Sequence, residues 1–101
     1  MTRQVKRKPV MLISPDETLL DRGKTHGDFE KNAVISEAIK SIIHQSPTRP
    51  KHTSTMRLSL DMISGKLGRI CAGDPFTEDH WRDIAGYAML VANELYRKSQ
   101  K

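Results

Sequence analysis

The chain has 101 residues, the size of one ordinary domain, which leaves no room within it for a second catalytic domain. Lys and Arg number 17 against 12 Asp and Glu, so the net charge is +5. Seven of the positive charges lie in residues 1–8 and 97–101, which hold no acid, so the body between them carries 10 − 12 = −2. The excess charge therefore belongs to the two ends and is not evidence for a broad nucleic-acid-coating surface.

The single cysteine, Cys71, forms no disulfide within the chain, as is typical of a reducing compartment. The longest purely apolar run, residues 10–13, is far shorter than the roughly 20 residues of a membrane span. We therefore expect a cytoplasmic protein with no membrane partner.

The N-terminal region divides into a basic arm at 1–8 and the short apolar segment 10–13, which together form the expected segment 1–13. A short strand, a docked extended segment and an oligomer contact all remain open for 10–13. Ser14 then has the features of a helix N-cap, with Pro15 at the first helical position. Gly23 ends this first helix, and a polar loop follows.

Three further helices are predicted. The second ends before Pro47, and a linker with two prolines follows at 46–53. The third is closed by Gly73 and Pro75, and Thr77 caps the fourth, whose first turn is acidic. Apolar residues recur at helical spacing in all three. They are Phe29, Ala33, Val34, Ala38, Ile39, Ile42 and Ile43, then Met56, Leu60, Ile63, Leu67 and Ile70, and finally Trp81, Ile84, Ala88, Val91 and Leu95.

These patterns predict an all-α fold, a compact bundle of about four helices of which two are long. The expected helical domain spans residues 14–97 and a basic tail spans 98–101. Because the apolar stripes exceed what a thin four-helix monomer covers, we also expect a homo-oligomer.

Each long helix carries a second stripe of glycine and acidic residues. Helical glycine costs about 1 kcal/mol relative to alanine, so it indicates either a close helix crossing or room for a ligand. The carboxylates need a cation, a donor or water, and a buried ion pair is as good an explanation as a binding site. The stripes are Asp61, Gly65, Gly68 and Ala72 on the third helix, and Asp79, Asp83, Gly86, Leu90 and Asn93 on the fourth.

The loop at 22–28 places Arg22, Lys24 and His26 among glycines just before a helix N-terminus, an arrangement that suits a phosphate. A solvated loop with Asp28 as the N-cap is the alternative. A P-loop is excluded because Thr18 stands where its first glycine is required.

Three motifs stand out together: LDRGKTHGDF at 20–29, LDMI at 60–63 with Lys66 and the stop at 73–75, and WRDIAGY at 81–87. They resemble a family of small phage and prophage proteins described as MazG-like. The resemblance covers residues 18–96 and implies phage origin, location in a bacterial host cell and a compact helical fold.

The resemblance also implies a distant likeness to MazG-type nucleotide pyrophosphohydrolases, which hold magnesium on paired acidic motifs. Asp83 matches the last acid of such a motif, but His80 stands where the preceding Glu belongs. A metal, if one is bound, is expected on Asp61, Asp79 and Asp83. The chain does not match all four carboxylates of the hydrolases' acidic motifs. We therefore expect no catalytic residues and no cofactor. Mg²⁺ is implied only if the chain is a hydrolase.

Three functions are therefore considered. The first is a non-catalytic nucleotide-binding protein, which sequesters a nucleotide-derived immune signal of the host and so serves host defence evasion. The second is a MazG-like pyrophosphohydrolase. The third is a nucleic-acid or protein-interaction module acting through residues 1–8. It is less favoured because four cations without aromatic residues make a small binding surface.

Candidate ligand-binding residues are Arg22, Lys24, His26, Asp28, Asp61, Lys66, Arg69, Trp81, Asp83 and Tyr87.

Overall fold

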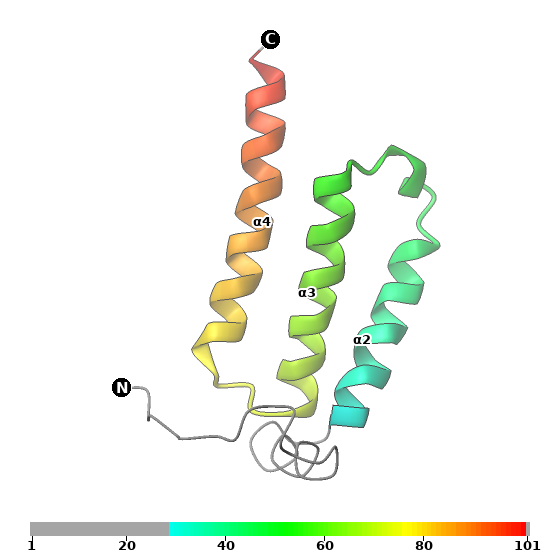
Figure 1. Ribbon diagram of the computed structural model, residues 1–101, viewed down its shortest axis with the longest axis vertical. Helices are drawn as coiled ribbons and strands as arrows, with labels where there is room; N and C mark the ends of the chain where they lie inside the picture. Colours follow the sequence, from blue (N-terminus) through cyan, green and yellow to red (C-terminus); the bar gives the residue numbers. More distant parts are fainter. Residues whose placement is uncertain (1–28, 101) are drawn as a thin grey trace, which may run out of the picture.

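The computed structural model describes residues 29–100, and this part of the chain is built of helices without strands. The helices are α2 (Phe29–His44), α3 (Ser54–Ala72) and α4 (Glu78–Ser99), with a 3-10 turn, η2 (Arg49–Lys51), between α2 and α3. They lie side by side with α3 in the middle, and neighbouring helices run antiparallel (Figure 1). The all-α prediction is confirmed for these residues. The first helix, the basic arm and the loop at 22–28 lie outside the described part.

The helix ends follow the predicted signals with one exception. α2 ends before Pro47, and Gly73 is the C-cap of α3. Thr53 is the N-cap of α3, and its hydroxyl accepts a hydrogen bond from the Met56 N–H. Thr77 occupies the N-cap of α4 but makes no side-chain capping bond, so that prediction is wrong. Both threonines have a φ of −72°, but ψ is 167° at Thr53 and 107° at Thr77, so the two caps differ in backbone conformation as well as in bonding.

Small residues fill the contact between α2 and α3. A Cβ atom on Gly68 would lie 2.9 Å from the backbone oxygen of Asn32 and would overlap the side chains of Asn32 and Ser36. The tight-crossing explanation is therefore confirmed at Gly68. A Cβ on Gly65 or Gly86 would have no atom within 4 Å, so these two glycines serve no close approach.

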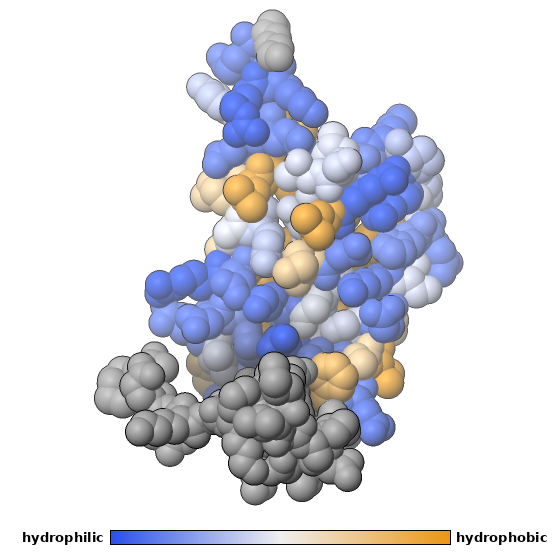
Figure 2. All heavy atoms as spheres, viewed as in Figure 1, coloured by the Kyte–Doolittle hydropathy of each residue, from blue (hydrophilic) through white to orange (hydrophobic). Residues whose placement is uncertain are grey.

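The expected apolar seams are only partly covered. Among the described residues Ile70 is the only large apolar side chain that is buried. Val34 and Ile42 are 69% and 73% exposed, and Trp81 and Leu95 on α4 are 53% and 47% exposed. A single layer gives each outer helix only one neighbour, so the rest of its apolar surface stays open. On the face shown in Figure 2, hydrophobic residues reach the surface over α4 and α3.

Polar contacts join the helices on both sides of α3. The Glu94 carboxylate on α4 accepts hydrogen bonds from the Thr53 and Thr55 hydroxyls, at 2.8 and 2.9 Å. These bonds lower the pKa of Glu94. On the other side, His44 Nε2 on α2 lies 3.2 Å from Asp61 Oδ1 on α3. No helix within residues 29–100 has the length and apolar character needed to cross a membrane.

Candidate functional site

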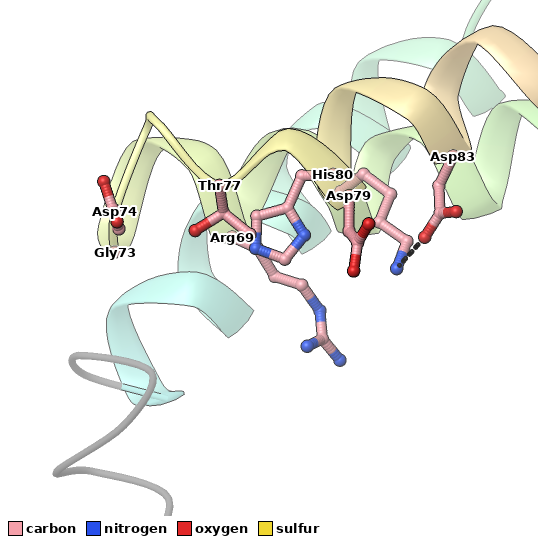
Figure 3. Close-up of a pocket in the computed structure, with 8 residues that line it drawn as sticks. Arg69, Gly73, Asp74, Thr77, Asp79, His80 and Asp83 are labelled. Atoms are coloured by element: carbon pink, nitrogen blue, oxygen red, sulfur yellow. Dashed lines mark ion pairs between the residues drawn. The ribbon is translucent and has the colours of Figure 1, made fainter. Parts of the chain in front are cut away.

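A hollow of about 410 Å³ lies where α3 ends and α4 begins (Figure 3). Its lining is rich in charged side chains and contains no large apolar one. The lining residues are Lys66, Arg69, Gly73, Asp74, Thr77, Asp79, His80 and Asp83.

The connecting turn forms this hollow by reversing the chain within a few residues. The Gly73 N–H donates to the Arg69 carbonyl and closes α3. The Asp74 carboxylate accepts from the Phe76 N–H at 2.9 Å, and the Asp74 carbonyl accepts from the Thr77 N–H at 3.3 Å. Such Asx-type bonding favours a tight turn. The last turn of α3 and the first turn of α4 therefore face each other.

Lys66 and Asp83 join the two helices across the hollow. Lys66 Nζ lies 2.9 Å from Asp83 Oδ2, the contact drawn as a dashed line in Figure 3. The hydrogen bond from Lys66 lowers the pKa of Asp83 below its ordinary value. The Lys66 side chain is only 20% exposed, so its charged end is held in place beside the hollow.

Arg69 lies one turn further along α3 and has no such partner. No ion pair formed within residues 29–100 involves its guanidinium, and the residue is exposed. Its side chain extends to the same side of the helices as those of His80 and Asp79 (Figure 3). A guanidinium carries a fixed charge and several donors, so Arg69 is available to an anion.

His80 places a half-buried imidazole ring beside these cations. Burial lowers its pKa, and the charges of Lys66 and Arg69 lower it further. Its Nδ1 atom is buried and has no hydrogen-bond partner within the described part of the chain. A buried polar atom in this state gains stability from a partner supplied by water or a ligand.

The first turn of α4 adds backbone donors. The His80 N–H donates to the Thr77 carbonyl at 3.2 Å, and Thr77 adds no side-chain capping bond. Among the described residues, the N–H groups of Glu78 and Asp79 are therefore left to water or a ligand. The positive end of the helix dipole lies at the same place and favours an anion.

The acidic side chains do not form a metal-binding cluster within residues 29–100. No three His, Cys, Asp or Glu residues there are grouped closely enough to hold an ion. Asp79 and Asp83 both line the hollow, but Asp61 contacts His44 instead. The three carboxylates expected for a metal are thus not gathered in one place.

The predicted ligand-binding residues fall into three groups. Lys66, Arg69 and Asp83 lie together at the hollow. Asp61, Trp81 and Tyr87 do not line it, and the Trp81 indole N–H donates instead to the Pro75 carbonyl at 2.8 Å. Arg22, Lys24, His26 and Asp28 lie outside the described residues, as does the arm considered for nucleic-acid binding.

The sequence did not identify four of the lining residues, Gly73, Asp74, Thr77 and His80. The signal was the Gly-Asp-Pro stop at residues 73–75, since so short a turn places the residues just before it beside those just after it.

Comparison with protein-family models, with curated proteins and with solved structures finds no match to this chain.

Proposed function

We propose that this protein binds a small phosphorylated ligand of the nucleotide type in the hollow between α3 and α4 and holds it without hydrolysing it. The observation that carries the proposal is Arg69, which extends beside the hollow without a carboxylate partner among residues 29–100. The start of α4 adds positive potential at the same place.

The carboxylates of the hollow favour a ligand that carries donors as well as a phosphate. Asp74, Asp79 and Asp83 outnumber Lys66 and Arg69, so a bare polyanion would meet repulsion. A nucleotide presents ribose hydroxyls and base amino groups, which Asp79 and the His80 ring accept. The volume of about 410 Å³ lies within the range of small-molecule sites. Trp81 and Tyr87 lie elsewhere, so stacking on an aromatic ring has no part in the proposal.

Binding without turnover is supported by the distribution of the acids. A pyrophosphohydrolase of the MazG type needs several carboxylates around its magnesium. The described residues contain no cluster of three metal-binding side chains. Origin in a phage and capture of a nucleotide-derived immune signal remain predictions from the resemblance.

Calorimetry of the full chain against linear nucleoside triphosphates and cyclic nucleotides tests the proposal. Arg69→Gln should weaken the binding of the best ligand by about 10-fold or more, since bonds to charged groups contribute roughly 1.5–3 kcal/mol. Lys51→Gln is the matched control, because Lys51 lies in η2, beyond the other end of α3. Chromatography after incubation with Mg²⁺ should recover the ligand intact. Release of pyrophosphate would favour the hydrolase instead, and the absence of binding to every nucleotide would refute the proposal.

A further inference from the structure

The charged side chains that line the hollow do not balance one another. Lys66 and Asp83 form an ion pair at 2.9 Å and neutralise each other. Of the charged groups that remain, Arg69 is a cation, and Asp74 and Asp79 are carboxylates. None of these three forms an ion pair with another residue in the described part of the chain. With two cations against three carboxylates, the lining has a net charge of −1 and offers one free cation to a ligand.

The ring of His80 does not change this balance at neutral pH. Burial lowers the pKa of the ring below the ordinary value of 6.5, and the charges of Lys66 and Arg69 lower it further. The ring is therefore mostly uncharged at neutral pH and acts on a ligand through its hydrogen-bonding atoms.

The start of α4 adds donors that carry no full charge. The backbone N–H groups of Glu78 and Asp79 have no partner among the described residues, and such groups hold phosphate oxygens at a helix N-terminus. The Asp79 carboxylate extends to the same side of the helices as Arg69 (Figure 3). A phosphate bound there meets one guanidinium and also lies near a carboxylate.

We propose that the hollow selects a phosphodiester, whose phosphate carries one negative charge, over a phosphomonoester or a polyphosphate. This inference rests on the proposed function and names the class of nucleotide that the site takes. One guanidinium binds one such phosphate through two parallel hydrogen bonds and balances its charge. A phosphomonoester carries about −1.5 to −2 at neutral pH. Its second charge is repelled by Asp79 and has no cation to balance it.

The pair of Lys66 with Asp83 does not supply the missing cation. If Lys66 turned to the phosphate, Asp83 would lose its partner in the same hollow, and the total charge would stay the same. The hydrogen bond from Lys66 lowers the pKa of Asp83, so this carboxylate is ionised at neutral pH. The balance of charge therefore does not depend on which anion Lys66 contacts.

Calorimetry with two ligands that differ by one methyl group tests the inference on the full chain. A nucleoside 5′-monophosphate is a monoester, and its methyl ester is a diester with the same base and ribose. For the base that the site prefers, the methyl ester should bind about 10-fold or more tightly at low ionic strength, where charges are least screened. Equal binding, or tighter binding of the monoester, would overturn this inference and leave the proposed function standing. If no nucleotide of either kind binds, the proposed function fails and this inference fails with it.

The variant Asp79→Asn tests the cause of the preference. It removes one carboxylate from the lining, so the monoester should bind more tightly and the ratio of the two dissociation constants should fall by about 3-fold or more. Because both ligands carry the same base and ribose, a contact of Asp79 with either group cancels from the ratio. Glu37→Gln is the matched control, since it removes an exposed carboxylate of α2 that does not line the hollow. An unchanged ratio in Asp79→Asn, or an equal change in Glu37→Gln, would overturn the inference.

Discussion

The Lys66 ammonium lies 2.9 Å from the Asp83 carboxylate and joins α3 to α4 at the edge of the hollow. The pair leaves Lys66 largely neutralised and fixed in position. Arg69, one turn later on the same helix, keeps its full charge for an incoming anion. The nucleotide proposal therefore depends on Arg69 more than on the cation that is already paired.

The first prediction concerns the titration of His80. Its pKa should lie below the ordinary value of 6.5, because burial and the charges of Lys66 and Arg69 disfavour the imidazolium. Arg69→Ala removes one of these charges and should raise the pKa. Asp83→Asn removes a charge that favours the imidazolium and should lower the pKa further. NMR of the ring protons against pH measures both shifts, and a His80 that titrates above 6.5 would show that the described environment is wrong.

The second prediction concerns the crossing of α2 and α3. Gly68→Ala forces a methyl group against Asn32 and Ser36 and should destabilise the fold by about 1–3 kcal/mol. Gly65→Ala, on the same helix with nothing within 4 Å, should stabilise it by about 0.5–1 kcal/mol through helix propensity. Urea unfolding of the two variants gives the comparison. Equal effects of the two changes would contradict a close approach at Gly68.

The third prediction compares the two N-cap threonines. Thr53→Ala loses the capping bond to Met56 and the bond to Glu94, so it should cost about 1–2 kcal/mol of folding free energy. Thr77→Ala should cost much less, because Thr77 makes no side-chain capping bond. Thermal unfolding distinguishes the two, and a larger loss for Thr77→Ala would refute this assignment of the caps.

The fourth prediction concerns acid stability. The folded chain lowers the pKa of Glu94 below its ordinary value of 4.5, chiefly through the bonds from Thr53 and Thr55. The carboxylate therefore contributes stability that is complete above 4.5 and is lost as the pH falls through the lowered pKa. Glu94→Gln should be less stable than the native chain at neutral pH and should lose less stability on acidification below 4.5. Unfolding midpoints measured across this range test the sign, and parallel curves would contradict it.

Local signals predicted the helices and their ends well. A proline or glycine ends a helix through its own backbone and its immediate neighbours, so the helix ends at Pro47, Gly73 and Pro75 can be predicted from the sequence. The side-chain cap predicted at Thr77 was wrong, because a capping bond requires particular backbone and side-chain dihedral angles that the composition of the turn does not determine.

The site was predicted less completely, because its contacts depend on how the helices are arranged. Lys66, Arg69 and Asp83 were identified as charges beside glycines. Asp61 pairs with His44 because α2 packs beside α3, and the periodicity of apolar residues does not predict which helices are neighbours. The exposure of Trp81 and Leu95 on α4 has the same origin, since a helical stripe does not reveal whether a neighbour covers it.

Amide NMR with the best nucleotide from the calorimetric panel tests whether the ligand lies in the hollow between α3 and α4. We expect the largest changes in chemical shift between Lys66 and Asp83, and we expect Arg69→Gln to remove most of them while Lys51→Gln leaves them in place. Changes confined to residues away from the hollow, or unaltered by Arg69→Gln, would contradict it.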